Sequence, residues 1–220
     1  MSKKSFKLFS MLVILIGVLA MGVAMAFLTA SDENVNTFVI GDVKIDLDEP
    51  NWIPPTEVVQ GDVITKDPAV TNTGSNDAFV FMEVSIPKRQ IYTYDPETNM
   101  RIENSIEGYT PLVQTNATTA PYTNTNTVDS HWVKVAEDKT NELWDKYVYA
   151  YGSDSACTRL AADDTTPPVF ESISYCYAVE GQGLDKDTFN VRLTSYAIQA
   201  DDLAATTPGE VWTLMKNQNG

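Results

Sequence analysis

The stretch GDVITKDPAVTNTGSNDAFVFMEVSI, residues 61–86, is the most regular part of the chain. Gly61-Asp62 is typical of a turn, and Asn72–Asp77 predicts a second one. The runs beside these turns are rich in β-branched and aromatic residues, so the stretch predicts a β-hairpin. In the second run every other side chain is apolar, which predicts a strand with one buried face. The side chains on that face are Val80, Met82, Val84 and Ile86.

Length and charge set limits on the kind of protein. The chain has 220 residues, enough for one β domain whose core is large enough to fold without disulfide bonds or bound metal ions. Strand-forming residues alternate with frequent turn residues, which predicts an all-β fold. The formal net charge is −15, and all 30 acidic residues follow Ala26. Because so acidic a body repels phosphates, we expect no nucleic-acid partner.

The N-terminus has the parts of a secretory signal peptide. Three lysines precede an uncharged apolar run over Met11–Ala26, which ends in the small-x-small site Ala24-Met25-Ala26. We therefore expect residues 1–26 to be removed and residues 27–220 to be secreted as a single domain. The alternative is an uncleaved membrane anchor over Met11–Leu28, which is at the lower length limit for a span.

The region after this site predicts another hairpin. Asn36–Ile40 and Val43–Leu47 flank Gly41-Asp42, which suits a two-residue turn. In the second strand the apolar positions alternate with polar ones, so one face is expected to point inward. The inward residues are Val43, Ile45 and Leu47, and the outward ones are Lys44, Asp46 and Asp48.

The C-terminal part predicts a long strand and a helix. Thr188–Ala200 is expected to be the longest strand, and its apolar positions change parity at Thr194-Ser195, which predicts a bulge. Thr207 as N-cap, Pro208 as the first helical residue and Glu210 two positions later predict a short helix that seals one end of a β-sandwich.

Catalytic and metal-binding patterns are missing from the sequence. His131 is the single histidine, so the H-E-x-x-H motif of zinc peptidases cannot be built, and no G-x-S-x-G presents a serine. We expect no catalytic residue, no small-molecule substrate and no metal. Calcium is a weaker alternative, for which the sequence offers three acidic clusters. They are Asp46 with Asp48 and Glu49, Asp163 with Asp164, and Asp185 with Asp187. None of them matches the EF-hand pattern.

Two cysteines leave two interpretations open. An even count in an exported chain allows one disulfide between Cys157 and Cys176. The alternative is a pair of small buried apolar side chains.

The N-terminal half resembles a known family. The signal peptide ending at Ala26-Phe27, then NTFVIGDVKIDLDEPNW, then GDVITKDPAVTNTGSNDAFVFMEVSIP, is similar to the TasA/camelysin family of exported bacterial proteins with a SipW-type signal peptide. The likeness is dense over Leu8–Pro87 and looser beyond, and Gln60 stands where a proline often precedes Gly-Asp. It implies a jelly-roll-like β-sandwich, biofilm-matrix fibres, and recognition of Ala24, Ala26 and Phe27 by a SipW-type signal peptidase. The camelysin branch carries a metallopeptidase label, which the histidine count disfavours.

Together these features predict a secreted structural subunit of an extracellular matrix fibre or cell-surface layer. Cleavage frees a segment that begins with large apolar residues, and such a segment can add as a strand to the open edge of a neighbouring sandwich. Head-to-tail addition that does not close makes filaments. The donor strand is predicted over residues 27–35, with Phe27, Leu28 and Val35 as its apolar residues. Alternatively, this segment packs in its own domain, or the protein is a cell-surface binding module for a glycan or protein.

Overall fold

The computed structural model describes residues 42–102, 109–116, 126–184, 189–203 and 205–219. Residues from Gly41 onward form one compact unit. The predicted signal peptide, its cleavage site and the donor strand lie outside the described residues, as does the first strand of the hairpin predicted around Gly41-Asp42.

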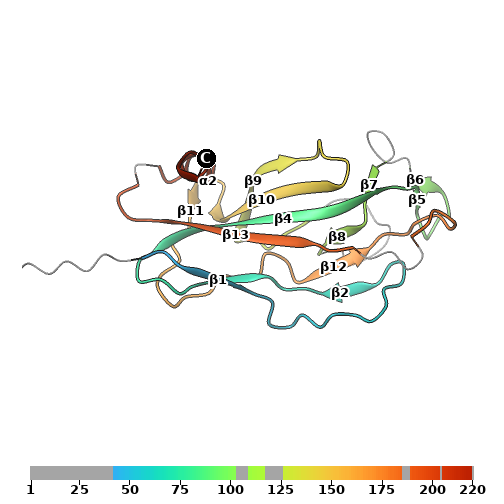
Figure 1. The fold of residues 1–220 in the computed structure, drawn as a ribbon, viewed down its shortest axis with the longest axis horizontal. Coiled ribbons are helices and arrows are strands. Elements are labelled where there is room, and N and C mark those ends of the chain that lie inside the picture. Colours follow the sequence, from blue (N-terminus) through green and yellow to red (C-terminus); the bar gives the residue numbers. More distant parts are fainter. Residues whose placement is uncertain (1–41, 103–108, 117–125, 185–188, 204, 220) are drawn as a thin grey trace, which may run out of the picture. The chain divides into compact units, whose positions relative to one another are not determined.

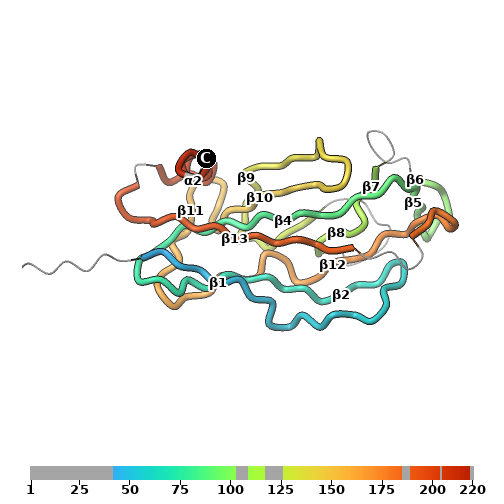
Figure 2. Tube along the Cα trace, in the orientation of Figure 1, coloured from blue at the N-terminus to red at the C-terminus, as the bar shows by residue number. Residues whose placement is uncertain are grey.

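The first layer is a six-stranded antiparallel sheet (Figure 1). Its central strand is β4 (Ala78–Gln90), with β10 (Trp144–Ser153) on one side and β13 (Arg192–Gln199) on the other. The sheet is completed by β9 (Trp132–Asp138), β11 (Ala156–Cys157) and β7 (Tyr109–Pro111). In the tube view, β4 and β13 run beside each other along their length (Figure 2).

The second layer consists of two smaller antiparallel sheets. One pairs β1 (Ile45–Asp48) with β3 (Ala69–Asn72). The other has the order β2 (Val63–Thr65), β12 (Ser172–Tyr175), β8 (Val113–Thr115). A small sheet of β5 (Thr93–Tyr94) and β6 (Arg101–Ile102) and the helix α2 (Pro208–Asn219) complete the described elements. The all-β sandwich with a short C-terminal helix is thus confirmed.

Two apolar clusters hold these elements together. The first lies between the layers and joins Val80, Met82 and Val84 of β4 to residues of the second layer such as Val70 and Ile173. The second lies on the other face of the six-stranded sheet, under α2. It contains Phe79, Phe81, Val148, Ala150, Ile198, Val211, Trp212 and Met215. The sheet is therefore buried on both faces where the helix covers it.

The hairpin predicted over residues 61–86 is wrong, although its strands and turn exist. β3 pairs with β1, whereas β4 pairs with β10 and β13, so the turn after Asn72 carries the chain from one layer to the other. The side-chain amide of Asn72 holds this crossover: its Nδ2 donates to the carbonyl oxygens of Asn76 and Leu160, at 2.8 and 2.9 Å. The prediction of a single buried face is also wrong, because Phe79 and Phe81 are buried under the helix.

The bulge predicted at Thr194-Ser195 is also wrong, and β4, not β13, is the longest strand. The pairing of β13 with β4 runs without a shift from Arg192 to Gln199. Leu193 packs against the cluster between the layers, whereas Tyr196 and Ile198 pack against the cluster under α2. The change of parity therefore marks where the helix begins to cover the strand, and the backbone alternates regularly throughout.

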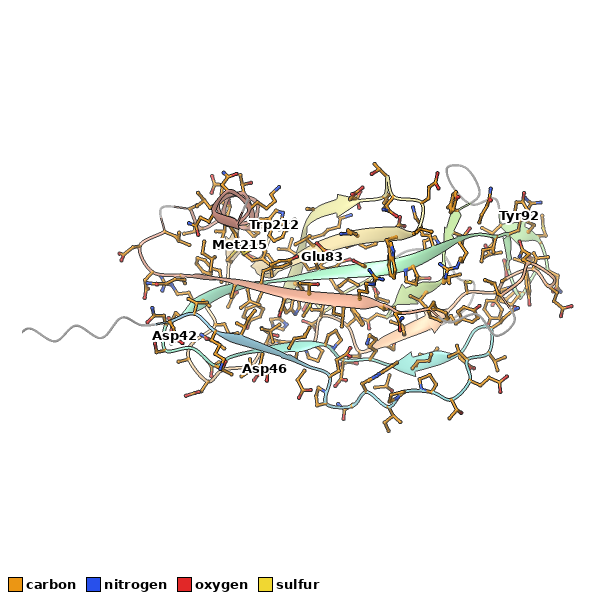
Figure 3. All side chains as sticks on the ribbon, in the orientation of Figure 1. Asp42, Asp46, Glu83, Tyr92, Trp212 and Met215 are labelled. Carbon is orange, nitrogen blue, oxygen red and sulfur yellow. The ribbon has the colours of Figure 1, made fainter. Side chains whose placement is uncertain are left out.

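The helix begins where the sequence predicts. The Thr207 hydroxyl donates to Glu210 Oε2 at 2.5 Å, and the Val211 amide donates to the Thr207 carbonyl oxygen at 3.0 Å. Trp212 packs with its ring centroid 5.4 Å from that of Phe81 (Figure 3). The helix therefore covers the outer face of the six-stranded sheet and does not seal an end of the sandwich.

Candidate functional site

The candidate site is the seam between β1 and β13, the two edge strands that face each other across one side of the sandwich. Among the described residues, β13 pairs with β4 alone and β1 pairs with β3 alone. An edge strand presents a row of backbone N–H and C=O groups that can pair with another strand. Both walls of the seam are therefore templates for strand addition.

The core is incomplete along the seam. Six apolar side chains pack against the cluster between the layers, yet each keeps part of its surface exposed. They are Val43, Ile45, Leu47, Val191, Leu193 and Ala197. An added strand would cover this surface, and burying apolar surface is favourable by about 25 cal/mol per Å².

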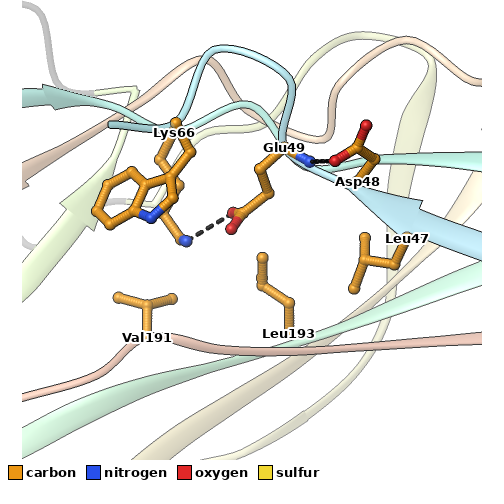
Figure 4. Close-up of a pocket in the computed structure, with 7 residues that line it drawn as sticks. Leu47, Asp48, Glu49, Lys66, Val191 and Leu193 are labelled. Atoms are coloured by element: carbon orange, nitrogen blue, oxygen red, sulfur yellow. Dashed lines mark hydrogen bonds and ion pairs between the residues drawn. The ribbon is translucent and has the colours of Figure 1, made fainter. Parts of the chain in front are cut away.

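A pocket of about 420 Å³ opens at one end of the seam (Figure 4). Leu47 of β1 lines one side, and Val191 and Leu193 line the other. Asp48, Glu49, Trp52 and Lys66 complete the lining. The pocket thus combines apolar walls with a charged rim.

Lys66 lines this pocket, and its neighbour Asp67 supports the loop beside it. Lys66 Nζ lies 2.6 Å from Glu49 Oε1 and 4.3 Å from the centroid of the Trp52 ring. The Asp67 carboxylate accepts hydrogen bonds from the backbone N–H and the side-chain amide of Asn51, at 3.1 and 2.7 Å. Both side chains are buried, so they hold the loop that follows β1 in a fixed position. The Lys-Asp pair, recognised in the sequence only as part of a motif, is therefore structural support for the seam.

A second motif fixes the chain at the start of β1. The Asp42 amide donates to Ser75 Oγ at 3.0 Å, and the Ser75 amide donates to the Asp42 carbonyl oxygen at 3.1 Å. A Cβ on Gly74 would lie 2.5 Å from that carbonyl oxygen, so the close approach requires glycine. The amides of Thr73 and Gly74 both donate to the Lys44 carbonyl oxygen. We call this set of contacts the Asp42 clamp.

The remaining site residues from the sequence divide into two groups. Ala24, Ala26, Phe27, Leu28 and Val35 lie outside the described residues. In β1 and the two residues before it, the inward and outward assignments are confirmed: Val43, Ile45 and Leu47 pack on the core, while Lys44, Asp46 and Asp48 are exposed.

The two cysteines are free thiols, so a disulfide between them is not formed. Cys176 is buried in the cluster between the layers, and Cys157 is half-buried beside the cluster under α2. Burial raises the pKa of the Cys157 thiol to about 11 and that of Cys176 to about 12. Both thiols therefore act as small apolar side chains.

His131 lies on the surface, where its Nδ1 is 2.7 Å from Asp129 Oδ1. The backbone N–H of His131 lowers the pKa of the Asp129 carboxyl. Within the described ranges, no three histidine, cysteine or acidic side chains gather in an arrangement that could hold a metal ion. No helix in the same ranges is long and apolar enough to cross a bilayer.

Comparison with known proteins supplies no relative to guide the function. No family model matches the chain, and no curated protein or solved structure matches it at a significant level. The seam and the sequence motifs around it are therefore the features from which a function can be inferred.

Proposed function

We propose that the protein is a secreted structural subunit of an extracellular matrix fibre or cell-surface layer, assembled by donation of an N-terminal strand to the next copy. The observation that carries the proposal is the seam, where one edge of β13 has no partner strand among the described residues and the apolar side chains beside it are incompletely buried. Strand addition supplies backbone hydrogen bonds and covers these side chains, which is how β-augmentation gains affinity.

The proposed donor matches the proposed acceptor in length. β13 has eight residues, and at about 3.3 Å per residue its edge is roughly 26 Å long. Residues 27–35 are nine residues long and can span this edge, while residues 36–41 connect them to the domain. The free edge of β13 is thus long enough for the whole predicted donor strand.

The sequence resemblance supports the same function. The residues that carry the likeness to the TasA/camelysin family include Lys66, Asp67, Gly74 and Ser75. Their contacts hold the seam pocket and the start of β1. Processing by a SipW-type signal peptidase at Ala26-Phe27 would free the donor strand, so that export precedes assembly.

Deleting residues 27–35 from the mature chain tests the proposal. We expect a folded monomer that forms no fibres, because the body keeps its core while the donor is lost. Electron microscopy and sedimentation velocity would compare the truncated chain with the chain that begins at Phe27. Fibres of unchanged length and yield from the truncated chain would refute strand donation.

A binding module for a glycan or protein is the second candidate, favoured by one exposed aromatic ring, Tyr92, just before β5. Tyr92 is 48% exposed, with the Arg101 guanidinium 3.2 Å from its ring centroid. The Val179 amide donates to the Tyr92 carbonyl oxygen, and Tyr94 and Tyr177 pack with ring centroids 5.8 Å apart. An exposed aromatic ring such as Tyr92 offers an apolar face on which a sugar ring can stack.

Calorimetry with chitin and cellulose oligosaccharides tests this second candidate. Binding should be lost in Tyr92→Ala. It should be kept in the control Met100→Ala, which changes another exposed side chain in the turn just before β6. Equal binding by both variants, or none by the unchanged protein, would leave the fibre subunit as the better account.

A further inference from the structure

A buried ion pair joins β4 to β10 beside the cluster between the layers. Lys88 Nζ is 2.9 Å from Asp145 Oδ1, and the two side chains are 8% and 7% exposed. Asp145 lies opposite Ile86 in the register of the two strands, so Lys88 is its diagonal neighbour on the same face. Ile86 and Tyr147, the next residues along that face, both belong to the apolar cluster. Strand pairing thus fixes the pair in apolar surroundings.

Charge pairing leaves part of this site unexplained. Taking two charges out of water is costly, and their attraction offsets the cost only when hydrogen bonds satisfy the remaining polar atoms. Lys88 Nζ donates to the Lys139 carbonyl oxygen at 3.1 Å, yet Asp145 Oδ1 accepts no hydrogen bond from the described residues. The ammonium therefore meets Oδ1 at close range but outside the angles of a hydrogen bond. We propose that Lys88 and Asp145 join in an intramolecular isopeptide bond, an amide between Nζ and the side-chain carbon Cγ.

The bond forms with the loss of one water molecule. A proton passes from the Lys88 ammonium to Asp145 Oδ1, which gives a neutral amine and a carboxylic acid. The amine lone pair attacks Cγ, and the π electron pair of the C=O bond moves onto Oδ2. One N–H proton then transfers to the Oδ1 hydroxyl, which leaves as water while the electron pair on Oδ2 restores the C=O bond. An ammonium and a carboxylate thereby become one neutral amide, and the step needs no further reactant.

Tyr147 is placed to assist the attack. Its hydroxyl donates to Asp145 Oδ2 at 3.4 Å, the oxygen on which negative charge develops. Burial raises the pKa of Tyr147, so the hydroxyl keeps its proton for this hydrogen bond. The strands hold the amine beside the carboxyl without a diffusional step, and this proximity strongly favours a reaction. Burial also limits the access of the water that would reverse it.

The ion pair of Lys66 with Glu49 is an internal comparison. Lys66 Nζ lies 2.6 Å from Glu49 Oε1, but the Glu49 side chain is 22% exposed and the pair borders the open pocket. Water reaches this pair, so we expect it to remain an ion pair. The amide goes beyond the proposed function and does not depend on it, because it lies within one domain. It would tie two strands of the six-stranded sheet together in a protein whose two cysteines are unbridged.

Intact mass spectrometry of the denatured monomer tests the proposal. The chain that begins at Phe27 should be one water lighter than its sequence requires, whereas Lys88→Arg should have its full calculated mass. Tandem mass spectrometry of a tryptic digest should find the peptide that contains Lys88 joined to the one that contains Asp145. A full mass for the unchanged chain, or a water loss that persists in Lys88→Arg or maps to Lys66 and Glu49, would overturn the inference.

Asp145→Asn gives a second mass measurement. Ammonia leaves in place of water, so the linked variant should have the same mass as the linked unchanged chain. A variant one water lighter than its own sequence requires would place the loss elsewhere and overturn the assignment. Circular dichroism of both variants checks that they fold.

A refolding time course tests whether the fold positions the reaction. Chain recovered unfolded and kept in denaturant should have its full mass, and should lose water only after the denaturant is removed. Tyr147→Phe, which keeps the ring in the core, should slow this loss about tenfold or more. Water loss in denaturant would contradict a positioned reaction, and an equal rate in Tyr147→Phe would contradict the role of the hydroxyl. Neither measurement requires fibres, so a failure of strand donation would leave the result intact.

Discussion

β4 and β13 are neighbouring strands of one sheet, yet they differ sharply in burial. In β4 the residues from Ala78 to Met82 are at most 3% exposed, because one face meets the second layer and the other meets α2. In β13 only Ile198 is buried, at 8%, and one edge has no described partner. Within the described residues, the sandwich is therefore complete at its centre and less completely buried at the seam. The proposed site for an added strand lies at this less buried part of the sheet.

The largest effect is expected at the centre. Phe81→Ala should cost about 3–5 kcal/mol of unfolding free energy, because it leaves a cavity between β4 and Trp212. Urea denaturation of the monomer measures this loss. A cost below about 1 kcal/mol would mean that α2 does not cover the sheet tightly, which would remove the contrast with the seam.

Gly74→Ala should have the next largest effect, about 1–3 kcal/mol. The new Cβ would lie 2.5 Å from the Asp42 carbonyl oxygen and 2.7 Å from the Lys44 amide nitrogen, so the backbone must shift. The matched control is Gly209→Ala, since a Cβ there meets nothing within 4 Å. Equal stability of the two variants in thermal unfolding would show that the Asp42 clamp is not tight.

Leu193→Ala should cost the monomer about 1–2 kcal/mol, since the side chain is only half-buried. Fibre assembly should fall more steeply than stability, because the same side chain would be fully covered by a donated strand. Thr194→Ala, on the exposed side of the same strand, is the control. Comparing denaturation with turbidity or electron microscopy separates the two effects; a parallel loss in both would argue against a role in assembly.

The smallest effect concerns the thiols. Because burial holds both pKa values well above neutrality, neither thiolate forms appreciably at pH 8, and reaction with a thiol reagent should be slow in the folded protein. Raising the pH toward 11 should speed the reaction of Cys157 before that of Cys176, which is fully buried. Immediate reaction of both thiols at pH 8 would show that the core opens readily.

Local pattern predicted much of this fold. The alternation in β1 identified its inward side chains, and the Thr207-Pro208-Gly209-Glu210 stretch identified the start of α2. These features depend on neighbouring residues alone, so they can be read from the sequence.

The pairing of strands and their assignment to the two layers could not be predicted from the sequence. The turn at Asn72–Asp77 gave no indication that β3 pairs with β1 and β4 with β10, because the choice depends on residues far along the chain, such as Leu160. From the sequence alone, the parity change at Thr194-Ser195 predicts a bulge, because the cover that α2 provides over part of the sheet is visible only in the structure. The roles of Lys66 and Asp67 were missed for a similar reason: their partners, Glu49 and Asn51, lie across a loop.

The Asp42 clamp has a mechanical consequence. Within the described residues, the chain enters the domain at Asp42, three residues before β1 begins beside β3, so a pull that arrives there meets the clamp first. A pull along the axis of β1 would load its hydrogen bonds to β3, together with those from Thr73, Gly74 and Ser75, at the same time. Shared tension of this kind resists rupture better than bonds broken one after another. The clamp that Gly74 and Ser75 form with Asp42 would then take up the applied force. It would protect the core from tension carried by the chain outside the domain.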